Sequence, residues 1–192
     1  MDSPGDNPSA RPTGDRLSAA QERFVATWGQ MGSTWGISRT MAEVHALLYI
    51  TGEPMCTDDV MERLAISRGN ASMSIRSLVD WGIVTRTHKR GDRKEYFQAE
   101  QDVWSLLQAI VRERMKRELQ PVLASLYEIR DLTASPERSG EVQPEVKTAA
   151  HHARIDGMID LVRTLEQMGE KLVELPKEQL QALAQQIAEP LG

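Results

Sequence analysis

One short stretch of this chain predicts β-strands, and nearly everything else predicts helices. Residues 83–88 are rich in β-branched side chains, and residues 94–97 add two aromatic ones after a turn at 90–92. β-branched and aromatic residues around a Gly-Asp turn are typical of a β-hairpin. Elsewhere in the 192 residues, apolar side chains recur at helical spacing. The fold class that follows is all-α with a small two-stranded β-wing.

Two short helices stand immediately before this hairpin. We expect the first over residues 58–65, capped by Thr57, and the second from its N-cap Ser67 to about Trp81, where Gly82 ends it. Only a tight turn is left between them. Helix, tight turn, helix and hairpin in this order predict a winged helix-turn-helix, whose second helix reads DNA.

Amphipathic helices are expected on both sides of this motif. Ser18 with Gln21, and Thr40 with Glu43, are capping-box patterns that predict two upstream helix starts. Downstream, one long helix is expected over residues 102–132, followed by further helices. The predicted organisation has three parts. Residues 1–16 form a disordered tail, and residues 17–100 form a winged helix-turn-helix DNA-binding domain with its N-terminal helix. Residues 101–192 form a helical dimerisation and effector region, with a linker over residues 133–144.

The positive charge of the chain is concentrated around the helix-turn-helix and the hairpin. The whole sequence has a formal net charge of −5, but residues 66–98 contain seven Lys and Arg and only three acids. A compact positive segment in an acidic chain is the pattern of a protein that meets phosphate on one surface. A solvated basic hairpin without a nucleic-acid partner is the alternative that charge alone leaves open.

The second helix of the motif has two different faces. At 100° per residue, one arc carries the apolar side chains expected in the core: Ala71, Ile75, Leu78 and Val79. The residues expected to address the major groove are Arg68, Gly69, Asn70, Met73 and Arg76. Asn70 suits adenine and Arg76 suits guanine, whereas Arg68 stands where the helix N-terminus would receive a phosphate. The alternative role of Arg76 is a solvated pair with Asp80.

Three basic residues surround the turn of the hairpin and are the wing's candidates for DNA contact: Arg90, Arg93 and Lys94. A wing of this kind can place an Arg in the minor groove, where groove width is read rather than base pattern. Asp92 is placed to hold a neighbouring Arg. The alternative is a charged hairpin that protects its own edge from aggregation.

The long helix over residues 102–132 carries a stripe of eight large apolar side chains. A small winged-helix body is expected to leave part of this stripe uncovered, and an uncovered patch of that size marks an interface. We therefore expect a homodimer. The competing arrangement is that the helices after residue 101 fold back on each other within one chain.

The remaining features predict little further chemistry. Trp28, Trp35 and Tyr49 could line an aromatic cage for a quaternary ammonium effector, although their helical spacing is more typical of a core. The chain has a single cysteine and no sequence motif for phosphate cradling, zinc binding or a catalytic nucleophile, so we expect no metal, no cofactor and no enzyme. No apolar run approaches the roughly 18 residues of a membrane span, and we expect a cytoplasmic protein without a membrane partner.

The helix-turn-helix and the wing also resemble a known family. Residues 66–73 (ISRGNASM), 80–84 (DWGIV) and 91–97 (GDRKEYF) are similar to the GbsR branch of the MarR-type winged-helix regulators. Two Trp-Gly pairs, which begin at Trp28 and Trp35, suit the same family. The resemblance implies a dimeric transcription regulator whose N- and C-terminal helices build the dimer, and whose best-known relatives answer to choline or related osmolytes.

The sequence therefore predicts a sequence-specific transcriptional regulator that is expected to repress. Its partners would be double-stranded DNA at a pseudo-palindromic operator, a second copy of the chain and a small-molecule effector. The alternative, from another class, is a winged helix used for protein–protein contact with no direct DNA binding. Retention on random duplex DNA that salt abolishes would separate the two.

Overall fold

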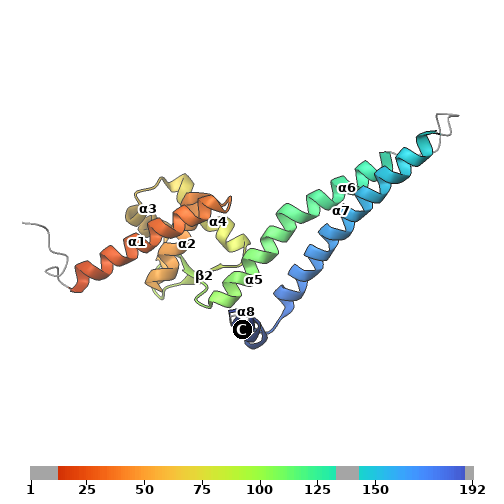
Figure 1. Cartoon of the computed structure of the whole chain (residues 1–192). Coiled ribbons are helices and arrows are strands. Elements are labelled where there is room, and N and C mark those ends of the chain that lie inside the picture. Colours follow the sequence, from red (N-terminus) through yellow and green to blue (C-terminus); the bar gives the residue numbers. More distant parts are fainter. Residues whose placement is uncertain (1–12, 133–142, 189–192) are drawn as a thin grey trace, which may run out of the picture. The chain divides into compact units, whose positions relative to one another are not determined.

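The computed structural model describes residues 13–132 and 143–188 (Figure 1), and these form two compact units divided between Val103 and Trp104. Most of the expected disordered tail and most of the expected linker lie outside the described residues. No helix in the described ranges is both long and apolar enough to cross a bilayer.

Unit 1, up to Val103, is a winged helix-turn-helix preceded by two helices. Its elements are α1 (Thr13–Thr34), α2 (Arg39–Thr51), β1 (Met55–Cys56), α3 (Thr57–Leu64), α4 (Arg68–Asp80), β2 (Val84–His88) and β3 (Glu95–Ala99). Five large side chains are less than 2 % exposed and form the centre of the core: Val44, Leu48, Val60, Leu78 and Val84. The mostly helical fold with a two-stranded wing is thus confirmed.

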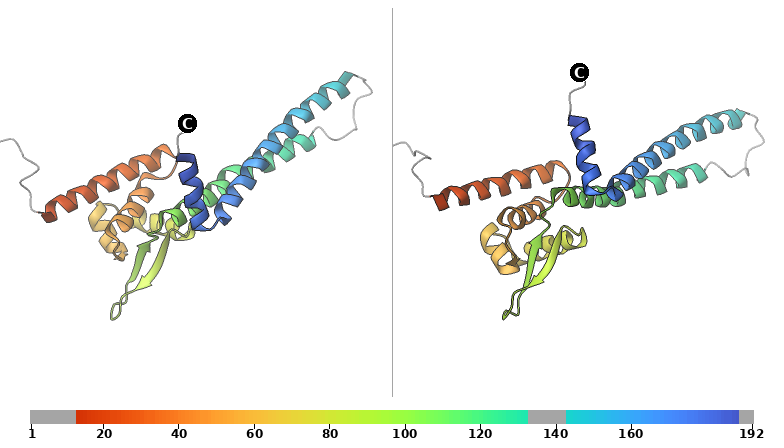
Figure 2. Two further views of the ribbon diagram at one scale, coloured as in Figure 1. Left: turned by 60° about the horizontal axis from the view of Figure 1, so that its bottom comes forward. Right: turned by 90° about the horizontal axis from the view of Figure 1, so that it is seen from below.

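The sheet has a third strand that the sequence pattern did not predict. The order is β1-β3-β2 with antiparallel pairing, and Phe97 of β3 lies opposite both Met55 and Arg86. β1 has only two residues, which is too short for an alternating pattern to show. β2 and β3 form a hairpin that projects from the helices of unit 1 (Figure 2).

The predicted starts of α1, α2 and α3 were wrong by a few residues, whereas the predicted N-cap of α4, Ser67, was right. α1 begins at Thr13, five residues before Ser18. The Ser18 hydroxyl donates to the carboxylate of Glu22, four residues later, instead of capping the helix. The N-cap of α3 is Cys56 rather than Thr57, and the Cys56 N–H donates to Asp59 Oδ2 at 2.8 Å. Because Cys56 also pairs with β3, its extended backbone fixes where α3 can start.

Close packing of α1 on α2 depends on two glycines. A Cβ added to Gly32 would lie 2.5 Å from Ala42 Cβ, and one added to Gly29 would lie 2.5 Å from Glu43 Cγ. Both distances are shorter than any ordinary carbon contact. These glycines weaken the helix locally, but they let the two backbones approach (Figure 1).

Unit 2, from Trp104 on, is built from long helices. α5 (Val103–Arg114) continues through a π-helical turn, η2 (Met115–Leu119), into α6 (Gln120–Leu132), and α7 (Gln143–Glu174) and α8 (Lys177–Ala188) follow. α6 lies beside α7 (Figure 2), where Arg130 forms an ion pair with Asp156. The Gln108 side chain donates to the Leu175 carbonyl at 2.8 Å. The helix expected over 102–132 is present, and the π-helical turn within it was not predicted.

We expect Gly32→Ala to destabilise the protein, because the added methyl group would force α1 away from Ala42. The free energy of unfolding should fall by about 1–2 kcal/mol, since overpacking outweighs the gain in helix propensity. Urea midpoints at matched protein concentration measure this. Gly14→Ala is the control on the same helix, because its Cβ would meet nothing within 4 Å. Equal midpoints for the two variants would contradict the packing argument.

Candidate nucleic-acid interface

α4 is held at its start by a cap and along its length by one buried face. Ser67 Oγ accepts a hydrogen bond from the Asn70 N–H at 3.3 Å, as the sequence predicts for an N-cap. The buried side chains of the helix are Ala71, Ser74, Ile75 and Leu78. Ser74 was not expected in this set, and Val79, which was, is only half-buried. The rotation of α4 about its axis is otherwise the one predicted.

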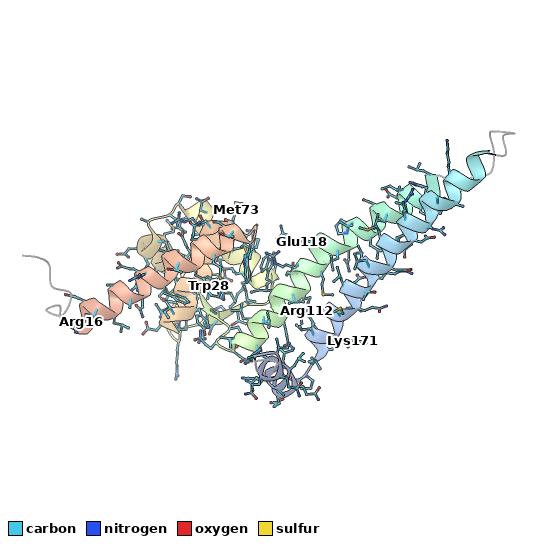
Figure 3. The ribbon with its side chains drawn as sticks, viewed as in Figure 1. Arg16, Trp28, Met73, Arg112, Glu118 and Lys171 are labelled. Atoms are coloured by element: carbon cyan, nitrogen blue, oxygen red, sulfur yellow. The ribbon has the colours of Figure 1, made fainter. Side chains whose placement is uncertain are left out.

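The opposite face of α4 is open to solvent. Met73 is 69 % exposed, a large value for an apolar side chain (Figure 3). The other residues of the predicted reading face are exposed as well: Arg68, Gly69, Asn70 and Arg76. Within the described part of the chain, Arg76 forms no ion pair, so the alternative pairing with Asp80 is not observed. Its guanidinium is available to an outside partner.

The wing is a hairpin whose turn is fixed by one carboxylate. Gly91 has a φ of 86°, a conformation that glycine adopts without strain. Asp92 Oδ1 accepts from the Lys94 N–H at 3.0 Å, and Asp92 Oδ2 accepts from the Tyr96 hydroxyl at 2.7 Å. The expectation that Asp92 holds a neighbouring Arg was wrong, because both of its oxygens are engaged by the backbone and by Tyr96.

The same hydrogen bond shifts two pKa values in opposite senses. It raises the pKa of Tyr96 to about 12 and lowers the pKa of Asp92. Lys89 Nζ lies 4.2 Å from the centre of the Tyr96 ring, a cation–π geometry. Tyr96 of β3 thus holds the turn of the wing through Asp92 and stays protonated at neutral pH.

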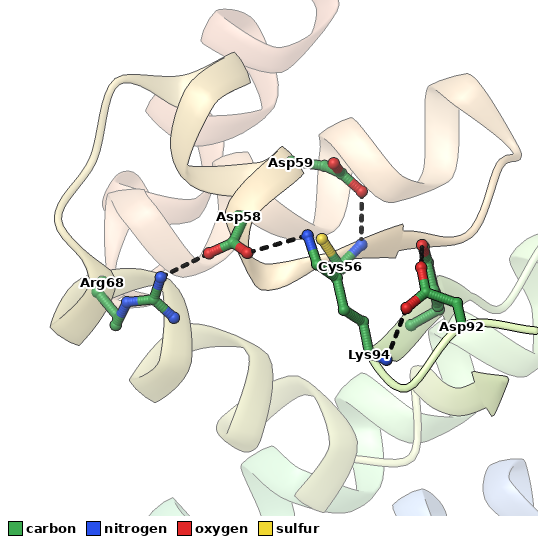
Figure 4. Close-up of polar contacts among 7 residues, drawn as sticks. Cys56, Asp58, Asp59, Arg68, Asp92 and Lys94 are labelled. Carbon is green, nitrogen blue, oxygen red and sulfur yellow. Dashed lines mark hydrogen bonds and ion pairs between the residues drawn. The ribbon is translucent and has the colours of Figure 1, made fainter. Parts of the chain in front are cut away.

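Two of the five predicted DNA-contacting cations, Arg68 and Lys94, form ion pairs with Asp58, which was not predicted as a site residue. Asp58, in the first turn of α3, pairs with Arg68 at 2.5 Å and with Lys94 at 3.3 Å (Figure 4). Arg90 and Arg93 are exposed and form no ion pair among residues 13–132 and 143–188. An acid is common in the first turn of a helix because its negative charge is stabilised by the helix dipole. The sequence therefore does not indicate that Asp58 also pairs with the two cations.

The aromatic residues predicted for an effector cage lie partly in a stack between α1 and α2. Phe24 lies 5.7 Å from Trp28 and 6.3 Å from Tyr49, and His45 lies 6.0 Å from Tyr49, all between ring centroids. Trp35 is 51 % exposed. Burial lowers the pKa of His45 to about 4, so this ring is neutral at pH 7. His45 therefore adds no positive charge to the group of rings that it forms with Phe24, Trp28 and Tyr49.

The geometry as a whole presents one exposed helix face and one basic hairpin from the same compact unit. An exposed Arg and Asn on a helix provide donors and acceptors of the kind that read base edges. Exposed Arg side chains at a hairpin turn are suited to phosphate or to the minor groove. A winged-helix protein that binds DNA presents a helix face and a basic wing of this kind.

Comparison with known proteins agrees with this geometry. Residues 35–95 match the model of the MarR family. Two repressors of Bacillus subtilis (strain 168) are similar: the HTH-type transcriptional repressor GbsR at 25 % identity over 112 residues, and the repressor OpcR at 24 % over 90 residues. The matches cover 58 % and 47 % of this chain and 62 % and 49 % of those proteins, so they span less than two thirds of either relative.

A solved structure supports the fold independently of the sequence matches. The crystal structure of a transcriptional regulator superposes with a TM-score of 0.51 at 20 % identity, and the match covers 80 % of this chain and 95 % of the other. At this identity the likeness concerns the fold alone. Residues 35–95, which include the helix-turn-helix and most of the wing, are therefore similar to the MarR family, and the chain is similar to the repressors GbsR and OpcR.

Proposed function

We propose that this protein is a sequence-specific DNA-binding transcriptional repressor. The observation that carries the proposal is the solvent-exposed face of α4 beside a basic wing. This face presents Asn70, Met73 and Arg76, and Arg76 forms no ion pair with any residue that the structure describes. The names of the relatives, both HTH-type transcriptional repressors, point to repression. Because its proposed partner is DNA, we also propose that the protein is cytoplasmic.

The experiment that tests this function is retention on random duplex DNA at increasing salt. A protein that neutralises several phosphates should bind at about 50 mM salt and lose most of that affinity by about 200 mM. A winged helix that binds only another protein should show no such retention. That result would replace the proposal with the protein–protein alternative.

We expect Arg76 and Arg90 to contribute differently. Arg76→Ala should cost about 1–3 kcal/mol on a selected site and relax the preference at one base pair of each half-site, since a base contact is lost. Arg90→Ala should weaken binding to all sequences alike and flatten the salt slope by about one unit. Site selection from a random pool, combined with salt titration, measures both effects.

The control for these variants is Arg39→Ala. Arg39 is an exposed cation of α2 that pairs with Glu43 at 2.8 Å, and its removal should leave DNA affinity nearly unchanged. If Arg76→Ala keeps its full base preference and loses only salt dependence, the assignment of the α4 face is wrong.

The proposal includes a homodimer that buries helices of unit 2. α6 contributes none of the buried side chains of the described residues, although it packs on α7. Large apolar side chains on α6 and α7 stay exposed: Val122, Ile129, Met158, Leu161, Leu165 and Met168. Folding back within one chain therefore occurs but leaves an apolar surface, and a surface of this kind marks an interface. A dimer would read a pseudo-palindromic operator.

We expect the protein to sediment at twice its chain mass of 21.5 kDa. Met168→Asp should weaken the dimer at least about tenfold, because a carboxylate would be buried in an apolar interface. Gln167→Asp is the control, since it adds the same side chain to the neighbouring exposed position away from the apolar stripe. A wild-type protein that sediments as a monomer at micromolar concentration would exclude the dimer.

The proposal extends to a small-molecule effector near Trp28, Trp35 and Tyr49. Aromatic rings around a neutral His45 are compatible with a quaternary ammonium group. Such a ligand can change DNA affinity only through a difference in its own affinity for two conformations. Titration of choline and glycine betaine against tryptophan fluorescence tests this ligand class, and an unchanged signal up to millimolar levels would remove it.

A further inference from the structure

One carboxylate lies between two cations from different elements of the proposed DNA-binding surface. Arg68 is the first residue of α4, and Lys94 stands in the wing just before β3. Asp58 Oδ1 contacts Arg68 Nη2 at 2.5 Å, and Asp58 Oδ2 contacts Lys94 Nζ at 3.3 Å (Figure 4). A single anionic group thus bridges the reading helix and the wing through its two oxygens.

These ion pairs have little part in holding the fold together. The side chains of Arg68, Lys94 and Asp58 are 67 %, 54 % and 47 % exposed, and exposed ion pairs contribute little to stability. The contact between α3 and α4 already rests on fully buried apolar side chains, among them Val60 and Ala71. Stabilisation of the fold therefore does not account for the position of Asp58 between Arg68 and Lys94.

The arrangement reproduces the way in which a phosphate is bound. Arg and Lys from two elements, converging on two oxygens of one anion, form a common phosphate site. Hydrogen bonds from Lys94 and then Arg68 lower the pKa of Asp58, so its carboxylate is ionised at neutral pH. The other three predicted cations, Arg76, Arg90 and Arg93, form no ion pair with an acid in the described ranges.

We propose that Asp58 occupies the place of a DNA phosphate between Arg68 and Lys94 and competes with the DNA backbone for these two cations. The inference rests on the proposed DNA-binding function and adds a residue to it. Asp58 lowers the affinity for duplex DNA of any sequence, because a phosphate that reaches Arg68 and Lys94 has to displace the carboxylate or lie close to it. Asp58 contacts no base, so it acts on the backbone contribution alone.

The test is Asp58→Asn, which removes the charge and keeps the size of the side chain. A negative charge about 6 Å from a phosphate in water weakens binding about threefold at low ionic strength. We therefore expect Asp58→Asn to bind random duplex DNA about threefold more tightly than wild type at about 50 mM salt. The salt slope should steepen by about one unit, since one more cationic charge can neutralise phosphate.

The matched control is Glu62→Gln, which removes the same charge from another position of α3. Glu62 lies one turn after Asp58 on α3 and lines a groove with Val25 of α1 and Leu47 of α2, and within the described residues it forms no ion pair with Arg68 or Lys94. We expect its DNA affinity and salt slope to stay close to those of wild type. In an Arg68→Ala/Lys94→Ala background, Asp58→Asn should no longer raise the affinity. Thermal unfolding of each variant checks that the fold is intact.

Several outcomes would overturn the inference. If wild type binds duplex DNA and Asp58→Asn binds equally or more weakly, Asp58 is not a competitor, and weaker binding would make it a residue that positions the two cations. An equal gain for Glu62→Gln, or a gain that persists without Arg68 and Lys94, would show only a change in net charge. If neither wild type nor Asp58→Asn binds DNA at low salt, the proposed function fails first, and this inference fails with it.

Discussion

Burial of one face of α4 is the interaction on which the rest of unit 1 depends. Ala71, Ile75 and Leu78 enter the core with Val44 and Leu48 of α2, and all are at most 3 % exposed. This packing fixes the rotation of α4, and a helix with one fixed face has its opposite face fixed as well. Arg76 and Met73 face solvent for that reason. The same core also positions the hairpin, because Val84, the first residue of β2, is buried in it.

Two acids adjust the basic surface that this packing exposes. Asp92 shapes the turn of the wing through the Lys94 N–H and the Tyr96 hydroxyl, and Asp58 holds the side chains of Arg68 and Lys94. The positive segment is therefore divided into cations engaged within the protein and cations exposed to an outside partner. In the proposed function, the affinity for the DNA backbone would depend on the arrangement of these charges as well as on their number.

Unit 2 differs from unit 1 in how far it satisfies itself. Among its described residues the buried side chains are few: Leu106, Ala109, Ile159, Val162 and Leu180. More of the large apolar side chains described in this unit are exposed than buried, with Leu132 at 81 % and Ile187 at 77 %. Hydrophobic burial is the main favourable contribution to folding. A second copy of the chain is the partner that would complete such a surface in the dimer proposed above.

The sequence by itself determined the order of the helices and the hairpin in the winged helix-turn-helix, the Ser67 cap, the two faces of α4 and the Gly91 turn. These features depend on local periodicity and turn chemistry, which a few neighbouring residues specify. Only the tertiary structure decided that Asp58 bridges Arg68 and Lys94. The same is true of Cys56, which both pairs with β3 and caps α3, and of Gly32, whose missing side chain lets α1 pack closely against Ala42 of α2. Each of these joins residues from different elements, and local periodicity carries no information about which distant side chains the packed core brings together.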